Sequence, residues 1–541
     1  MADPNDNDLY RFGSARFVGE EELERAGYFI KTPNSVFIGF FKGRPLWASG
    51  QAGICFTAGA RSGKFRDVLS YTLCSGILEG GHLVMFDPKG EGGYVSQDQT
   101  PDGKHCRFWN PLGLLGLPQD RINPFSHLTW DSPSLFSDMK VSVAGLLMSS
   151  GSPNAVYFEH NARRFLEAIG IILTKLNKRL TVPDLYQASL ALVRGDQVWL
   201  DLAYEMYRSG IDFVESVELE IAAAREDSSG GFKGIVGEIQ KSLACLSDPV
   251  LLRSVSPPFD FDLAELCREA PLVQFFIQCP AELIAPWAPV IKAIFTGAMI
   301  HKSRRPDAPS QTWILDECGQ LGIEGGFDLV PRMFTYGAGI GIRPIAVFQH
   351  EAQMNALGKD ARNIIKSSAS LQISFGTRDL DSARMASQTI GRQTLHYDIP
   401  VSQRQAHLKA RHSLGAVLRG ADPFQVARDL EMQAYETNYR HQVGRDVRTA
   451  AELLNAPANR MLLQGDGLTG PAWAERYPYS TIPWMAGRFH PNPLYGQHDR
   501  VEVQTRFGPR MRKVIVEPVP EAYADLPQYR SGLWSRIGGF L

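Results

Sequence analysis

The sequence lacks three features that would assign it to a specialised class of protein. Its seven cysteines include no CxxC pair, so neither a zinc site nor a disulfide framework is indicated, and buried reduced thiols are expected. Its longest apolar run, near residues 289–300, is broken by Lys292 and is too short to span a membrane. Its net charge is −2, so any basic surface for nucleic acid must be local or formed by assembly.

The start of the chain also carries no secretory signal, because residues 1–10 are polar and acidic where such a signal would be apolar. We therefore expect a cytoplasmic protein. At 541 residues the chain is too long for one hydrophobic core, and several compact units are expected.

Short apolar runs bounded by turns alternate with helix-length segments over much of the chain. This pattern predicts an α/β fold with a parallel sheet flanked by helices. Residues 134–250 differ, because apolar residues recur there at helical spacing, which predicts an inserted all-α domain. The tail after residue 441 is rich in proline, glycine and aromatics, and we expect it to be irregular and to wrap the main domain or a partner. The expected strands are 54–56, 81–87, 272–279, 312–315, 342–348 and 369–375.

Residues 54–68 contain, in this order, an apolar run, a loop of small residues, Lys64 and the start of a helical pattern. Strand, loop and helix in this order can cradle a phosphate with backbone N–H groups, and Lys64 would reach the β- and γ-phosphates. The pattern GxxxxGK[ST] is met imperfectly, since Ala58 replaces the first glycine and Phe65 replaces the hydroxyl that holds Mg²⁺. A plain strand-to-helix turn with a surface lysine is the alternative. The predicted nucleotide-binding residues are Gly59, Ala60, Arg61, Ser62, Gly63, Lys64 and Phe65.

Two acidic residues follow the apolar run that ends at Leu315. Asp316 stands where a carboxylate oxygen can hold Mg²⁺, and Glu317 can polarise the water that attacks the γ-phosphate. Gln349, directly after another predicted strand, can sense the γ-phosphate or the water. An acidic strand end without a metal and an ordinary loop glutamine are the alternatives. Because ligands bind at the carboxyl ends of parallel strands, the occurrence of all three beside Lys64 favours a nucleotide site.

Several segments together resemble the type IV secretion coupling proteins, the TraG/TraD-type hexameric ATPases of conjugation and effector export. The most specific segment is Asp-Pro-Lys-Gly-Glu at residues 87–91, and the least specific is Asp316-Glu317. The matching segments occur in order from residue 11 to about residue 395. They are 11–17, the loop ending at Lys64, 86–91, 108–112, 315–322, 348–349, 375–379 and 389–391.

The resemblance implies a RecA-like nucleotide-binding domain interrupted by an all-α domain. It implies ATP and Mg²⁺ as cofactors, with Lys64 on the phosphates, Asp316 on the metal, and Glu317 and Gln349 as catalytic residues. On this basis we expect an N-terminal extension at 1–42, a RecA-like domain at 43–133 and 251–440, an all-α domain at 134–250 and a C-terminal extension at 441–541.

The sequence departs from the family pattern in three places. The family carries N-terminal transmembrane helices that are not found here, so peripheral attachment at the bacterial inner membrane would depend on a partner. Phe65 removes the hydroxyl ligand. The arginine that acts on a neighbouring subunit has no clean match, and the candidates are Arg332, Arg343 and Arg378. Separately, Arg404, Lys409 and Arg411 form a basic cluster that could contact DNA in a hexamer channel or be a solvated helix face.

Three functions follow as hypotheses. The first is a homo-hexameric coupling ATPase that recruits DNA–relaxase or protein substrates to the other components of a type IV secretion system. The second is a hydrolysis-impaired scaffold that docks substrates or adaptor proteins. Phe65 and the unmatched arginine favour the scaffold, whereas Lys64, Asp316, Glu317 and Gln349 favour the ATPase. The third is a DNA motor unrelated to secretion. Cargo or adaptor proteins are expected on the all-α domain or the C-terminal tail, so deletion after about residue 475 is expected to spare nucleotide binding.

Overall fold

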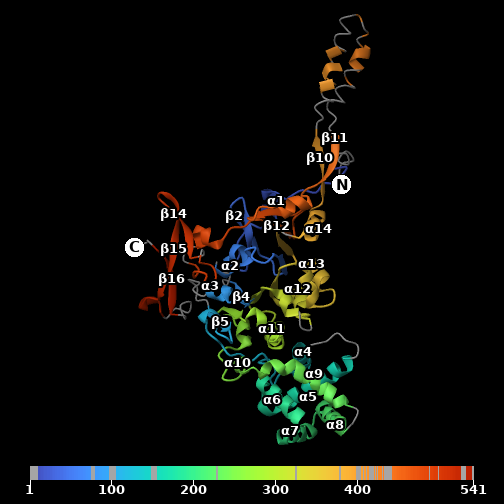
Figure 1. Ribbon diagram of the computed structural model, residues 1–541, viewed down its shortest axis with the longest axis vertical. Helices are drawn as coiled ribbons and strands as arrows, with labels where there is room; N and C mark the ends of the chain where they lie inside the picture. Colours follow the sequence, from blue (N-terminus) through green and yellow to red (C-terminus); the bar gives the residue numbers. More distant parts are fainter. Residues whose placement is uncertain are drawn as a thin grey trace. The chain divides into compact units, whose positions relative to one another are not determined.

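The computed structural model (Figure 1) divides into two compact units, a smaller one of Met1–Leu23 and Gly376–Trp473 and a larger one of Glu24–Phe375 and Ala474–Leu541. The described residues are 10–74, 80–96, 105–147, 155–226, 230–322, 326–376, 379–397, parts of 404–431, 441–485, 488–496, 499–524 and 532–538. These units differ from the predicted domain boundaries. One continuous hydrophobic core joins the sheet to the helical segment, so contacts do not separate the two.

The larger unit is built on a parallel sheet in the order β9-β3-β8-β7-β4-β6-β5. Every residue of β4, β6 and β8 is buried, as expected for parallel strands covered on both faces. The sequence predicted all of these strands except β5, which lies in a region that looked rich in turns. The strands are β3 (Ile54–Thr57), β4 (Gly81–Phe86), β5 (His105–Trp109), β6 (Val273–Ile277), β7 (Ser310–Leu315), β8 (Ile342–Phe348) and β9 (Leu371–Phe375).

Helices pack on this sheet from the segments between the strands. The longest apolar run of the sequence forms α11 (Ala288–Ser303), which is buried along nearly its whole length. α12 (Leu329–Ile340) packs against β8, and α13 (Ala361–Ser368) packs against α12. An antiparallel hairpin of β1 (Val36–Phe41) and β2 (Arg44–Ala48) also belongs to this unit, and β1 pairs with the end of β13 (Ala472–Glu475) at Glu475.

The described residues between 134 and 254 contain helices and no named strand, as the periodicity predicted. Side-chain caps fix several helix starts: Thr181, Asp196 and Asp248 each accept a hydrogen bond from a backbone N–H of the first turn. The helices are α4 (Leu135–Leu146), α5 (Val156–Asn177), α6 (Val182–Arg194), α7 (Gln197–Tyr207), α8 (Asp212–Glu226), α9 (Gly231–Leu243) and α10 (Pro249–Ser254).

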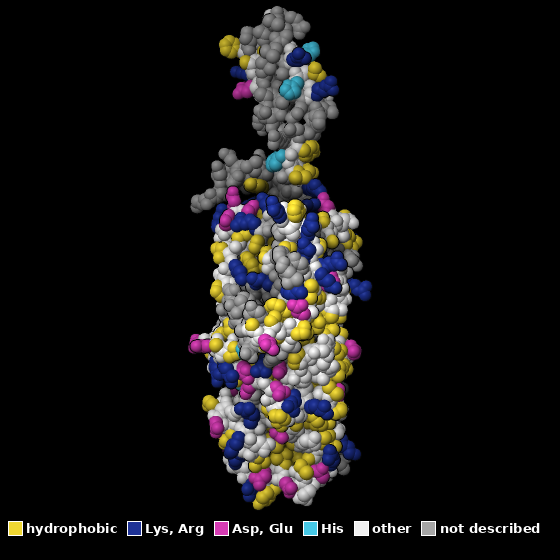
Figure 2. Space-filling model, turned by 90° about the vertical axis from the view of Figure 1, so that its left-hand side faces the viewer, with side chains coloured by type: hydrophobic (Ala, Val, Ile, Leu, Met, Phe, Trp, Pro, Cys, Tyr) yellow, Lys and Arg dark blue, Asp and Glu magenta, His cyan; other side chains and the backbone are white. Residues whose placement is uncertain are grey.

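The end of the chain folds onto the larger unit. Tyr479 and Phe489 are buried there with their rings 4.7 Å apart. Beyond them, β14 (Arg500–Thr505), β15 (Gly508–Pro518) and β16 (Leu533–Ile537) form an antiparallel sheet, visible in red in Figure 1. The sequence predicted the wrapping but not these strands, because glycine and proline in the tail obscure their pattern. Basic and acidic side chains both occur across the face drawn in Figure 2.

The smaller unit contains α14 (Leu380–Ile390), β10 (Arg392–Tyr397), β11 (His441–Asp446), α17 (Ala450–Leu454) and β12 (Arg460–Gly465). Its small core brings together Ala383, Ile390, Leu453 and Leu462. β10 and β11 pair in antiparallel register, with Arg392 opposite Asp446. Among the described residues, no helix combines the length and hydropathy needed for a bilayer span. All seven cysteines are free thiols, as expected from their spacing.

Candidate nucleotide site

The loop between β3 and Phe65 is the predicted phosphate-binding loop, and two of its residues have a left-handed backbone. Its first residue, Ala58, donates its N–H to the carbonyl oxygen of Phe348 at 2.8 Å and does not need the left-handed conformation of a glycine. Arg61 and Gly63 adopt left-handed φ values of 57° and 89°. Alanine can therefore replace the first glycine, whereas a side chain at Gly63 would bring a Cβ within 2.8 Å of Asp67 Oδ2.

Lys64 lies beside Asp316 and Glu317, the two acidic residues that the sequence assigned to the same site. Its Nζ is 2.6 Å from Asp316 Oδ1 and 3.9 Å from Glu317 Oε1. These three residues are about 8% exposed or less. These residues come close together because β3 and β7 both pair in parallel with β8 and end at the same edge of the sheet. Lys64, Asp316 and Glu317 thus come together at the carboxyl end of the sheet.

Glu317 is held in an unusual conformation by its neighbours. Its φ of 53° is left-handed, and its N–H donates to Asp316 Oδ1 at 3.0 Å. Lys89 Nζ lies 3.0 Å from Glu317 Oε1. Burial lowers the pKa of Lys89, but the charge and hydrogen bond of Glu317, together with the charges of Asp316 and Glu91, outweigh burial, and the net shift is upward. A strained acidic residue with a fixed carboxylate at a strand end is typical of a functional site.

Comparison with known families follows from this arrangement, in which Lys64 at the end of the loop faces two carboxylates. The model of the family described as type IV secretory system conjugative DNA transfer matches residues 12–413, most of the chain. The chain belongs to this family. Sequence comparison with curated proteins gave no match.

Solved structures of the coupling protein TrwB are similar in fold to this member of the conjugative DNA transfer family. TrwBdeltaN70 with sulphate matches with a TM-score of 0.57 and 14% identity, over 86% of this chain and 93% of that one. TrwB with ADP and Mg²⁺ matches with a TM-score of 0.56 and 14% identity, over 86% and 96%. TrwB with ADPNP matches with a TM-score of 0.55 and 15% identity, over 86% and 93%. The predicted RecA-like fold class is thereby confirmed.

Phe65, where nucleotide-binding loops carry serine or threonine, is a packing residue in this family member. Its side chain is 6% exposed, and its ring lies edge-on to Tyr479 at 6.5 Å between centroids. The side chain therefore points into the interior formed with the C-terminal segment. Of the predicted loop residues, Phe65 can offer a nucleotide only its backbone.

The predicted arginines and glutamine occupy different environments. Arg343 is 1% exposed and donates to the carbonyl oxygens of Asn34 and Gly50 and to Thr312 Oγ1, so it is a buried structural residue that cannot reach a neighbouring subunit. Arg332 is exposed on α12, and Arg378 lies outside the described residues. Gln349 is half-buried directly after β8.

The basic cluster of the smaller unit is exposed wherever it is described. Arg404, Lys409 and Arg411 are helical residues with exposed side chains. Both interpretations of this cluster, a DNA contact and a solvated helix face, are compatible with exposure.

Two buried acids of the motif at residues 87–91 lie near the loop. Asp87 Oδ2 accepts hydrogen bonds from the Gly93 N–H at 2.9 Å and from Gln278 Nε2 at 3.0 Å. Glu91 Oε1 accepts from Asn492 Nδ2 at 2.5 Å. Burial raises the pKa of Asp87 to about 6 and that of Glu91 to about 7. The sequence marked this motif, but it could not indicate that Asn492 would be its partner.

The raised pKa of Glu91 predicts a pH-dependent stability. Because the folded pKa of about 7 lies above the ordinary value of 4.5, folding takes up a proton between these values, and stability falls as the pH rises through that window. Glu91→Gln stays neutral and can still accept from Asn492. The variant should be more stable than wild type above pH 7, by roughly 3 kcal/mol at most, and no more stable at pH 4.5. Denaturant unfolding at several pH values checks this, and parallel pH profiles would contradict it.

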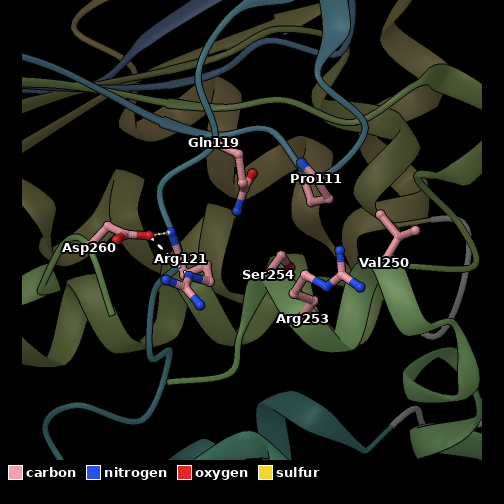
Figure 3. Close-up of a pocket in the computed structure, with 7 residues that line it drawn as sticks. All are labelled: Pro111, Gln119, Arg121, Val250, Arg253, Ser254 and Asp260. Atoms are coloured by element: carbon pink, nitrogen blue, oxygen red, sulfur yellow. Dashed lines mark hydrogen bonds and ion pairs between the residues drawn. The ribbon is translucent and has the colours of Figure 1, made fainter. Parts of the chain in front are cut away.

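A separate cavity of about 310 Å³ lies between the end of β5 and α10 (Figure 3). Arg121 and Asp260, which are paired at 3.2 Å, line it together with Arg253 and Ser254. It shares no residue with the loop at residues 58–64, so it is not part of the candidate nucleotide site.

Proposed function

We propose that this chain is the coupling ATPase of a type IV secretion or conjugation system. The observation that carries the proposal is the position of Lys64, 2.6 Å from Asp316 Oδ1 at the end of the loop. In an unliganded site, such a pair keeps a buried cation and a buried anion mutually compensated. When a phosphate and a metal bind, Lys64 exchanges Asp316 for the phosphate, and Asp316 exchanges Lys64 for the metal.

The residues present fit ATP and Mg²⁺, with one difference from the usual donor set. The left-handed loop and Lys64 suit a triphosphate, and the Asp316 carboxylate supplies the oxygen ligand that Mg²⁺ prefers. Phe65 supplies no hydroxyl, so the remaining metal ligands would be phosphate oxygens and waters. The metal, when bound, neutralises charge that develops on the phosphates.

The roles of the chain's own residues follow from their positions. Lys64 leaves Asp316 to bind the phosphates, and Glu317 accepts a proton from the attacking water. Lys89 holds the Glu317 carboxylate in place at 3.0 Å. Gln349, at the end of the adjacent strand β8, contacts the water or the γ-phosphate. Each step uses a residue at the carboxyl end of the same sheet.

We further propose a homo-hexamer in which Arg332 acts on the nucleotide of a neighbouring subunit. Arg332 and Tyr336 are exposed one turn apart on α12, and Tyr336 is 71% exposed. An exposed arginine and aromatic on one helix face are enriched at protein interfaces. Of the three predicted candidates, only Arg332 is both described and exposed.

Substrate or adaptor docking is proposed on α7. Leu200, Tyr204 and Tyr207 are 55–60% exposed at helical spacing, which makes an apolar stripe on one face. Tyr204→Asp should lower conjugative transfer of a cognate plasmid at least tenfold while ATP turnover stays at the wild-type rate. Leu219→Asp, an exposed leucine on α8, is the matched control. Equal transfer by both variants would remove α7 from the proposal.

Steady-state ATP hydrolysis with and without single-stranded DNA, together with nucleotide titration, tests the proposed function. Turnover is the expected result. Nucleotide binding without turnover would make the chain a hydrolysis-impaired scaffold. Turnover that DNA stimulates strongly in the absence of secretion components would favour an unrelated DNA motor. Absence of nucleotide binding would overturn the proposal.

A further inference from the structure

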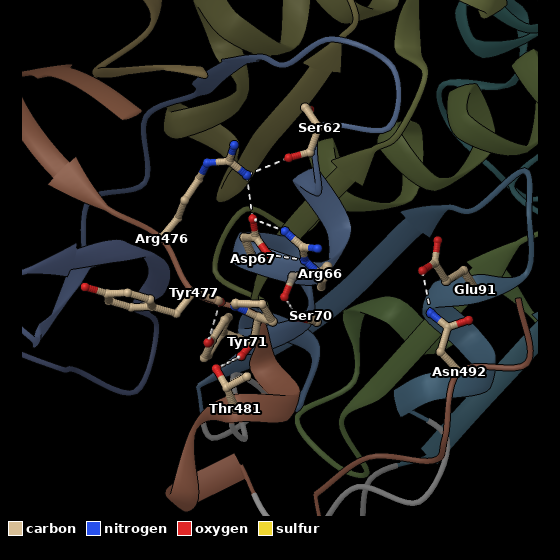
Figure 4. A network of polar contacts seen from close by, with 11 residues as sticks. Ser62, Arg66, Asp67, Ser70, Tyr71, Glu91, Arg476, Tyr477, Thr481 and Asn492 are labelled. Atoms are coloured by element: carbon tan, nitrogen blue, oxygen red, sulfur yellow. Dashed lines mark hydrogen bonds and ion pairs between the residues drawn. The ribbon is translucent and has the colours of Figure 1, made fainter. Parts of the chain in front are cut away.

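One arginine of the C-terminal segment, which follows β13, contacts the proposed phosphate-binding loop. Arg476 follows β13, and its Nη1 donates to the carbonyl oxygen of Ser62 at 2.5 Å and to Asp67 Oδ2 (Figure 4). The side chain is 6% exposed, and its guanidinium lies over the ring of Phe375 at 3.8 Å. This arginine is therefore an interior residue with fixed contacts on both sides.

The hydrogen bond to Ser62 sets the direction of a neighbouring amide. The carbonyl of residue 62 and the N–H of residue 63 belong to one planar trans peptide and point in opposite directions. When Arg476 holds the Ser62 carbonyl, the Gly63 N–H is directed away from Arg476. Loops of this kind bind phosphate through such backbone N–H groups. Arg476 thus controls the orientation of a donor immediately before Lys64.

The contact with Asp67 sets the charge beside the loop. Asp67 is 1% exposed, and its carboxylate also accepts from Arg66, with Nε at 2.5 Å from Oδ1 and Nη2 at 3.0 Å from Oδ2. Two guanidinium groups on one carboxylate leave a net charge of +1. Without Arg476 the cluster would be neutral, and the buried Asp67 carboxylate would keep only Arg66, whose side chain is 35% exposed.

Other contacts hold the segment around Arg476 in place. Tyr71 Oη donates to the carbonyl oxygen of Tyr477 at 2.8 Å, and Tyr479 packs edge-on against Phe65. Further along, Asn492 donates to Glu91. These contacts tie the chain that follows Arg476 to Phe65, Tyr71 and Glu91, so Arg476 reaches the loop from a segment that is itself packed in place.

We propose that Arg476 is a positioning residue of the nucleotide site, which orients the Gly63 amide toward a bound phosphate and compensates Asp67. The inference rests on the proposed nucleotide binding. It predicts the opposite of one expectation from the sequence: deletion after about residue 475 removes Arg476 and should weaken nucleotide binding rather than spare it.

The test compares Arg476→Gln and Arg476→Lys with wild type and with Arg488→Gln, an exposed arginine of the same segment. ATP affinity and KM should weaken at least tenfold in Arg476→Gln and less in Arg476→Lys, with kcat at saturation within about twofold. Arg488→Gln should match wild type. A purely structural residue would lower Tm in proportion to its loss of contacts but leave KM unchanged in the folded protein.

A second substitution separates charge from orientation and covers the case in which Arg476→Gln fails to fold. In Asp67→Asn/Arg476→Gln the buried carboxylate is absent, so the double variant should fold and recover part of the lost ATP affinity. If wild type binds ATP and the folded Arg476 variants bind it equally well, the inference is overturned. If wild type itself does not bind ATP, the proposed function fails instead, and the two failures are distinguishable.

Discussion

Glu317→Gln should bind ATP as tightly as wild type and turn it over about 10²–10⁴-fold more slowly. The carboxylate of Glu317 is fixed by Lys89 at 3.0 Å and by a left-handed backbone, so it is already oriented before any ligand arrives. Glutamine has the same shape, but it cannot accept a proton from water. Binding by titration and turnover at saturating ATP, measured on one preparation, give the two quantities.

The control for this variant is Glu282→Gln, an exposed glutamate outside the site, which should behave as wild type. Lys89 loses its ionic partner in Glu317→Gln, but its side chain is 44% exposed and can be solvated, so the fold should persist. Wild-type turnover in Glu317→Gln would reject Glu317 as the catalytic base and would direct attention to Gln349.

Lys64→Ala should lose ATP binding and also lose stability in the absence of ATP. Removal of the lysine leaves Asp316 buried without its cation, and breaking a buried pair in this way costs about 3–5 kcal/mol. In Lys64→Ala/Asp316→Asn the unpaired charge is also absent, so stability should return while ATP binding stays lost. Denaturant unfolding and nucleotide titration on the single and double variants measure both effects.

This pair of variants separates a ligand-binding lysine from a structural one. If stability and ATP binding returned together in Lys64→Ala/Asp316→Asn, Lys64 would act through Asp316 alone. If Lys64→Ala bound ATP like wild type, the loop would be an ordinary strand-to-helix turn. Lys366→Ala, which breaks the half-buried pair with Glu351, is a suitable control for the loss of a lysine elsewhere in the same unit.

The parts of the site that could be predicted from the sequence are those that local patterns specify. Lys64 and Asp316 each follow an apolar strand, and parallel pairing brings such strand ends to one edge. The helical segment at 134–250 was evident from its periodicity. The strand β5 was not, because its five residues lie beside a turn-rich stretch and carry little periodicity of their own.

The rest depends on contacts between distant parts of the chain. Nothing around Arg476 distinguishes it from other arginines in an aromatic tail, and its partner Asp67 is an ordinary aspartate in sequence. In the sequence Phe65 appears only as a departure from the motif, because its packing partner Tyr479 lies far along the chain. The unit boundary at Gly376 could not be placed either, because the core of the smaller unit joins Ala383 and Ile390 to Leu453 and Leu462, which are distant in sequence.

The contact between Arg476 and Asp67 joins residues separated by 409 positions, and that between Asn492 and Glu91 joins residues separated by 401. Chains leave the ribosome from the N-terminus, so the loop emerges long before the residues that complete it. A chain terminated before residue 476 would therefore carry the whole Lys64 motif without the second arginine on Asp67. Translation must therefore pass residue 476 before the proposed nucleotide site has the contacts to Ser62 and Asp67 that position it.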